Sequence, residues 1–236
     1  MSQIQLSSSA KQILSNSISS DNLLECFSKL LSTEKEGFLR YFLLEGSPSI
    51  FNKEPLKFEV VKDWMSSRFN LHPKEIFLLG SAKAGYSLKP VKFGTLFGAS
   101  SDLDFAFVSE NLFNSVKIEF FKWVDDFQSG LILPRNDNEK KYWPENVKTV
   151  KATLSKGFID ANKIPNRYAY PINQNINNQL YNLKVILENS EPKYKVKKAN
   201  ARIYQTLQKL TERLSLNFSV IVNKIEKQNL IGNPSN

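Results

Sequence analysis

Two apolar runs, one on each side of residues 80–101, form the clearest pattern in the chain. The run from Ile76 to Leu79 is wholly apolar and ends at Gly80-Ser81, which predicts a buried strand, a tight turn and the start of a helix. Residues 101–108 first alternate polar and apolar side chains and then become wholly apolar. This is typical of a strand with one end at a site and the other in the core. We expect the rest of the chain to be organised around these two strands.

Apolar residues recur at helical spacing on both sides of this stretch. The predicted helices are residues 21–31, 38–43, 56–69, 112–127, 147–154, 180–187 and 203–221. Residues 1–20 contain eight serines and few large apolar groups, which favours a flexible or loosely helical arm. The pattern therefore predicts three parts: a Ser-rich arm (1–20), a core with N-terminal helices (21–165) and a helical C-terminal region (166–236).

Two aspartates at the exposed end of the second predicted strand give the first indication of chemistry. Asp102 and Asp104 are two residues apart on a strand, so their side chains project from the same face. Adjacent carboxylates repel each other unless a cation lies between them, and Mg²⁺ is typically held by one or two carboxylates together with substrate phosphates. The alternative is a loop in which both side chains are in water. The upstream Gly80-Ser81 turn favours a metal site, because glycine lets a phosphate approach the backbone closely.

Net charge narrows the class of partner. The chain of 236 residues has 32 basic and 23 acidic side chains, a formal charge of +9, which favours polyanions such as nucleotides, nucleic acid or anionic lipid. A cationic substrate would be repelled.

The cysteine and histidine content excludes other kinds of site. Cys26 is the only cysteine, so neither an internal disulfide nor a thiolate metal site is expected. The only histidine, His72, precedes Pro73 in a predicted turn. No run has the length of a membrane helix, and residues 1–20 lack the pattern of a secretory signal. We therefore expect a cytoplasmic protein without membrane insertion.

The two motifs, Gly80-Ser81 and Asp102-Leu103-Asp104, resemble the nucleotidyltransferase superfamily that includes DNA polymerase β. The likeness covers residues 76–108. Twenty residues, Ala82 to Ser101, separate the motifs, which is longer than usual in that superfamily and suggests an inserted loop at residues 88–100. The wider string, with Gly85-Tyr86-Ser87 and Phe93-Gly94, is similar to a group of bacterial nucleotidyltransferases, some of them in phage-defence loci.

This resemblance implies a fold and a reaction. The fold would be α/β (α+β), with a small mixed sheet flanked by helices and a helical C-terminal part. The reaction would transfer a nucleoside monophosphate from a nucleoside or deoxynucleoside triphosphate to a hydroxyl and release pyrophosphate, with Mg²⁺ or Mn²⁺ as cofactor. Asp102 and Asp104 would be the catalytic metal ligands. Gly80, Ser81, Lys83 and Ser87 would bind the nucleotide.

Two further groups are candidates by the same resemblance, each with an alternative. The superfamily uses a third acidic ligand on a later strand, and Asp160 follows the apolar pair Phe158-Ile159; it is equally consistent with a cap of the next turn. The basic run 193–198, with Lys197 and Lys198 as the nucleotide-binding candidates, suits a phosphate cradle or a solvated surface.

The acceptor stays open at this point. Charge and size favour template-independent synthesis of a short oligonucleotide or nucleotide signal, with a single-stranded oligonucleotide as product or acceptor. A role in antiphage defence with an effector protein partner would follow from the resemblance. The alternatives are nucleotidylation of a protein or a small molecule, and a non-catalytic nucleotide-binding antitoxin or adaptor.

Overall fold

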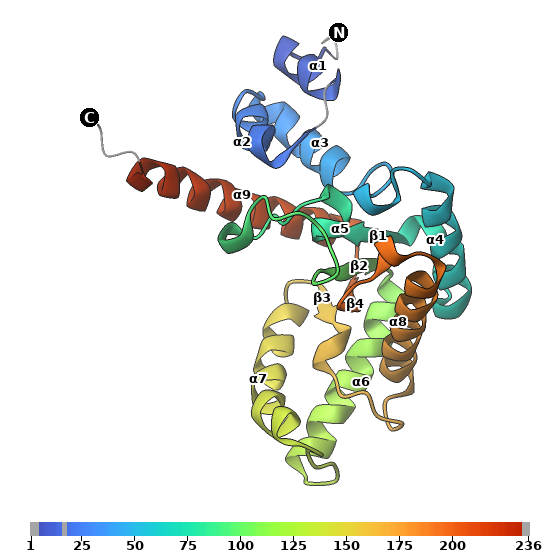
Figure 1. The fold of residues 1–236 in the computed structure, drawn as a ribbon. Coiled ribbons are helices and arrows are strands. Elements are labelled where there is room, and N and C mark those ends of the chain that lie inside the picture. The colour runs from blue at the N-terminus through green and yellow to red at the C-terminus, as the bar shows by residue number, and fades with distance from the viewer. Residues whose placement is uncertain (1–4, 16–17, 233–236) are drawn as a thin grey trace.

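A four-stranded mixed sheet lies at the centre of the molecule (Figure 1). The computed structural model describes residues 5–15 and 18–232. The strands are β1 (Ile76–Leu79), β2 (Asp102–Val108), β3 (Phe158–Asp160) and β4 (Lys198–Tyr204), in the spatial order β1-β2-β4-β3. β1 is antiparallel to β2, β2 is parallel to β4, and β3 is antiparallel to β4. The predicted small mixed sheet flanked by helices is therefore confirmed.

One face of the sheet carries the main hydrophobic core. Leu103, Phe105 and Phe107 alternate along β2 and are at most 2% exposed, as expected for the inward positions of a strand. Figure 1 shows α6, α7 and α8 on this side of the sheet. The helices that supply this core are α4 (Pro55–Phe69), α6 (Glu110–Gln128), α7 (Asp137–Leu154) and α8 (Pro171–Ser190).

The opposite face is covered over only part of its length. Ala106, Phe158 and Tyr204 pack there against Leu210 of α9 (Leu207–Gly232). At the other end of the same face, Asp102, Asp104 and Asn200 stay partly exposed. The sheet thus offers an open polar area beside a covered apolar one.

The N-terminal helices pack against α9 rather than against the main core. They are α1 (Ser8–Ser15), α2 (Ser20–Ser28) and α3 (Ser32–Leu43), and Leu23, Phe38 and Phe218 share their apolar cluster. The arm predicted for residues 1–20 includes α1, where Ala10 is 6% exposed; residues 1–4 and 16–17 of that arm lie outside the described ranges.

None of the described helices is both long and apolar enough to cross a membrane. The remaining elements of the fold are short. They are α5 (Gly80–Ala84), η1 (Ser49–Phe51), η2 (Pro73–Glu75), η3 (Pro90–Lys92), η4 (Ala161–Lys163) and η5 (Pro192–Tyr194).

The prediction of a wholly helical region 166–236 is wrong at residues 198–204. These residues form β4, which lies between β2 and β3, and α9 begins only at Leu207. Ile203 falls at helical spacing from later leucines, but its position in the fold is opposite Phe107 on β2. Pairing with a strand far away in the sequence overrides the local helical pattern.

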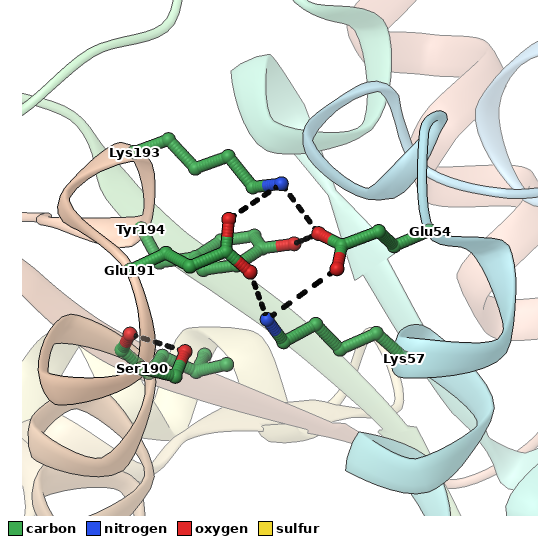
Figure 2. Close-up of polar contacts among 7 residues, drawn as sticks. Glu54, Lys57, Ser190, Glu191, Lys193 and Tyr194 are labelled. Carbon is green, nitrogen blue, oxygen red and sulfur yellow. Dashed lines mark hydrogen bonds and ion pairs between the residues drawn. The ribbon is translucent and has the colours of Figure 1, made fainter.

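A cluster of charged side chains fixes the segment that leads into β4 (Figure 2). We call it the Glu54–Lys193 cluster; it consists of Glu54, Lys57, Glu191, Lys193 and Tyr194. Lys57 Nζ lies 2.5 Å from Glu191 Oε1, and Lys193 Nζ lies 2.9 Å from Glu191 Oε2 and contacts Glu54. The Tyr194 hydroxyl donates to Glu54 at 2.7 Å. The start of α4 is thereby joined to η5.

Candidate active site

The two predicted carboxylates lie together on the open face of the sheet. β2 includes Asp102 and Asp104, and the buried Leu103 between them points to the core. In the register, Asp104 lies between Leu79 of β1 and Asn200 of β4. The strand predicted from the alternating pattern is confirmed, and with it the shared face of the two aspartates.

The hydrogen bonds of these carboxylates are incomplete. Asp104 Oδ1 accepts a hydrogen bond from Asn200 Nδ2 at 3.2 Å, and Asp102 Oδ2 lies 3.9 Å from Lys198 Nζ. Asp102 Oδ1 is buried and has no hydrogen-bond partner in the described part of the chain. A buried oxygen without a partner costs free energy. A bound cation or hydrogen-bond donor at this atom would remove that cost.

The turn after β1 comes directly against Asp104. Gly80 has φ +64°, in the left-handed region that favours glycine, and a Cβ at this position would lie 3.5 Å from Asp104 Oδ2. Ser81 follows in the first turn of α5 and is half-buried. The Gly80-Ser81 turn therefore lies beside the aspartate strand.

Ser87 belongs to a hairpin that fills the long interval between the motifs. Its backbone N–H donates to Thr95 at 2.8 Å, and its carbonyl accepts from Gly94 at 3.0 Å. The Ser87 hydroxyl accepts from the Lys89 backbone at 3.2 Å. This hydroxyl thus has a partner within the turn itself, and we do not include it in the site.

Lys83 has a local partner of a different kind. Its side chain is 7% exposed, and its Nζ donates to the carbonyls of Glu45 and Gly46, the latter at 3.0 Å. Burial lowers the pKa of Lys83 to about 8. These contacts attach α5 to the turn that follows α3, so we omit Lys83 from the nucleotide-binding group.

Asp160, the predicted third ligand, is paired with an arginine. Arg202 Nε donates to Asp160 Oδ1 at 2.6 Å and Nη2 donates to Oδ2 at 3.2 Å. β4 separates β3 from β2, so Asp160 is not on a strand next to Asp104. Burial disfavours the charged guanidinium of Arg202, but the hydrogen bonds that it donates to Asp160 outweigh this effect, and the pKa of Arg202 is raised. The role of Asp160 as a shared metal ligand finds no support in this geometry.

Asn200, which was not among the predicted site residues, lies beside Asp104. Asn200 occupies that position because β4 is the neighbouring strand. A signal was present: Lys198, Asn200 and Arg202 alternate with apolar residues in steps of two, which is the pattern of a half-buried strand.

The basic run before β4 divides between two environments. Lys193 belongs to the Glu54–Lys193 cluster, whereas Lys195 and Lys197 are exposed. The Lys197 backbone N–H donates to Ser101 at 2.9 Å, which brings this segment alongside the start of β2. Lys198 alone of this run has its ammonium group beside Asp102.

The donor set fits a hard divalent cation completed by a ligand. Within the described ranges, no group of three or more His, Cys, Asp or Glu side chains is arranged to hold a metal. Two carboxylates with one unsatisfied oxygen and an adjacent amide are nevertheless suited to Mg²⁺, which takes oxygen ligands and usually keeps substrate phosphates and water in its shell. Asp102 and Asp104 would be the protein ligands.

Comparisons with known proteins give no independent assignment. The chain matches no family model, no curated protein and no solved structure.

Proposed function

We propose that the protein is a metal-dependent nucleotidyltransferase. It would transfer a nucleoside monophosphate from a nucleoside or deoxynucleoside triphosphate to a hydroxyl acceptor. The observation that carries this proposal is the pair Asp102 and Asp104 on an open sheet face, with one carboxylate oxygen unsatisfied and the Gly80 turn against the other carboxylate. A single lysine at 3.9 Å from Asp102 offsets only part of the repulsion between these two acids, and a bound cation would offset the rest.

Each residue has a distinct part in this proposal. Asp102 and Asp104 would hold Mg²⁺ or Mn²⁺, which supplies charge stabilisation for the attacking and leaving oxygens of a phosphoryl transfer. Asn200 fixes the orientation of Asp104 through its hydrogen bond. Ser81 would donate to the triphosphate, and Gly80 would let the phosphates approach the backbone. Lys198 would contact a phosphate next to Asp102.

The bond changes follow from the reactants. The acceptor hydroxyl oxygen forms a bond to the α-phosphorus, while the bond between this phosphorus and the oxygen bridging to the β-phosphate breaks. The electron pair of the broken bond leaves with pyrophosphate, and the hydroxyl proton passes to water. The positioned charges of the site would stabilise the developing negative charge.

The product class we favour is a short oligonucleotide or a nucleotide signal made without a template. The formal charge of +9 suits an anionic acceptor and product. The resemblance to nucleotidyltransferases of phage-defence loci favours a cytoplasmic role in antiviral defence with an effector protein as partner.

A second candidate function is a nucleotide-binding module without turnover. Two observations favour it: Asp160 is paired with Arg202, and the residue beside Asp104 on the adjacent strand is the amide Asn200 rather than an acid. Such a module would bind the triphosphate and release no pyrophosphate.

Incubation with labelled nucleotides distinguishes these functions. The purified protein is mixed with each α-labelled nucleoside or deoxynucleoside triphosphate and Mg²⁺ or Mn²⁺, and all products, including the protein itself, are analysed by mass. Transfer that Asp104→Asn abolishes and Asp125→Asn preserves supports the enzyme; Asp125 is an exposed acid on α6. Nucleotide binding without any product supports the module. A product made equally by Asp104→Asn and wild type would overturn the site assignment.

A further inference from the structure

A row of polar and basic side chains runs along β4, next to the two aspartates. Lys198, Asn200 and Arg202 project from the same face as Asp102 and Asp104, because β2 and β4 are paired in register. Lys198 and Arg202 are four residues apart, a span of about 13 Å along a strand. The open face is thus bordered by the Gly80 turn on the β1 side and by basic side chains on the β4 side.

Arg213 of α9 extends this row beyond the end of the aspartate pair. Its guanidinium carbon lies 5.5 Å from the centre of the Phe158 ring, and that of Arg202 lies 4.7 Å from the same ring. Arg213 Nε is buried and has no hydrogen-bond partner among the described residues. A buried guanidinium donor without an acceptor is costly, which indicates that a ligand supplies the acceptor.

The local charges leave a positive excess at this place. Asp160 neutralises Arg202 through two hydrogen bonds, and Lys209, whose side chain lies against Gly157, is paired with Glu212 at 3.0 Å. The charge of Arg213 is not compensated by these pairs. An uncompensated guanidinium beside an aromatic ring suits a phosphate, which matches its planar fork of donors.

We propose that the basic area formed by Lys198 and Arg213, with the Asp160-paired Arg202 between them, binds the acceptor, and that the acceptor is a short single-stranded oligonucleotide. Its reacting hydroxyl would lie over the aspartates and an upstream phosphodiester at Arg213. The distance between Lys198 and Arg202 exceeds the size of one phosphate, so a strand along β4 contacts both ends of the row whereas a mononucleotide does not. The assignment of an acceptor rests on the proposed function; the presence of a phosphate site does not.

Direct binding tests the inference without turnover. A fluorescein-labelled hexathymidylate is titrated with the protein in EDTA, without metal or triphosphate, and anisotropy is measured at several salt concentrations. We expect Arg213→Gln to weaken binding by about tenfold or more and to reduce the slope of log K against log salt by about 0.7, the value for one lost single-strand phosphate contact. Arg213→Lys, which keeps the charge, should retain most of the slope and serves if the glutamine variant does not fold.

A matched control lies on the same helix. Lys224 is exposed on α9, and Lys224→Gln should change neither the affinity nor the slope. Equal effects of Lys224→Gln and Arg213→Gln, or no binding of hexathymidylate, would overturn the inference. Competition by thymidine monophosphate as strong as that by unlabelled hexathymidylate would overturn the oligonucleotide acceptor. Because the assay contains neither metal nor triphosphate, a failure of nucleotidyl transfer leaves its result unaffected.

Discussion

Two pairs of carboxylates in this molecule have opposite surroundings. In the Glu54–Lys193 cluster, two glutamates face two lysines and a tyrosine hydroxyl, so the charges cancel within the cluster. Asp102 and Asp104 have one lysine at 3.9 Å and one amide, and one of their oxygens is buried without a partner among residues 5–15 and 18–232. Compensated charges hold elements of the fold together, whereas uncompensated ones are a reason to look for a ligand.

The largest effect on transfer should follow from changing either member of the uncompensated pair. Asp102→Asn or Asp104→Asn removes a ligand of a cation that contributes several kcal/mol, so we expect a loss of about a thousandfold or more in turnover. Thermal stability measured without metal should stay level or rise, because one like-charge repulsion disappears. Unchanged turnover in either purified variant would refute the metal assignment.

A smaller loss is expected at Asn200, which touches Asp104 without bearing charge. Asn200→Ala removes the hydrogen bond that orients the carboxylate, and such supporting contacts are worth about 10–100-fold in metal affinity. Calorimetric titration with Mn²⁺ and a non-hydrolysable triphosphate measures it. Asn166→Ala, at an exposed amide pair between Asn166 and Asn178, is the control; equal affinities of the two variants would show that Asn200 has no such role.

Two substitutions in the turn beside Asp104 should weaken triphosphate binding to different extents. Ser81→Ala removes one hydroxyl donor and should cost about 0.5–1.5 kcal/mol of triphosphate binding, or up to about 3 if the acceptor is a charged phosphate. Gly80→Val should weaken binding more, because a β-branched residue is strained at φ +64° and would approach Asp104. The triphosphate affinity of each variant is compared with that of Ser219→Ala, an exposed position on α9. If neither Ser81→Ala nor Gly80→Val changes this affinity, the phosphate site lies elsewhere.

The compensated pair should affect stability and leave transfer unchanged. The Lys193 hydrogen bond, followed by that of Tyr194, lowers the pKa of Glu54 from 4.5 to about 2. A carboxyl with a depressed folded-state pKa stabilises the protein above its unfolded pKa and loses that contribution as pH falls. The stability difference between wild type and Glu54→Gln should therefore be constant above about pH 4.5 and shrink toward pH 2.

Urea unfolding at several pH values measures that difference. Lys193→Met should reduce the same pH dependence, because it removes the main partner of Glu54. A drop in transfer by Glu54→Gln in the folded protein would contradict the division between the two carboxylate pairs.

Local pattern was enough to predict the aspartate strand and its neighbouring turn. The alternation of Asp102, Leu103 and Asp104 assigns each side chain to a face of the strand from three residues alone. Gly80 directly follows an apolar run and so predicts where the preceding strand ends. Neither inference needs knowledge of a distant partner.

Non-local pairing accounts for the failures. β4 contains small residues on its inward face, Ala199 and Ala201, so its apolar signal was weak and its end merged with the pattern of α9. Without β4, the sequence does not show which residue lies beside Asp104, and Asp160 is a candidate third acid only through the resemblance. The pairing of Asp160 with Arg202 joins residues 42 positions apart, a relation that periodicity does not contain.

The position of β4 also governs when the site comes into existence during synthesis. Asn200 reaches Asp104 across 96 residues of chain, and β3 meets β2 only through β4. A nascent chain that has emerged only as far as α8 contains β2 with its two aspartates but does not yet contain β4. Contacts this distant in sequence form late and slow the folding of a domain. A ribosome-bound or truncated fragment would therefore lack a finished site, so the proposed transfer would require that residues 198–204 have been added.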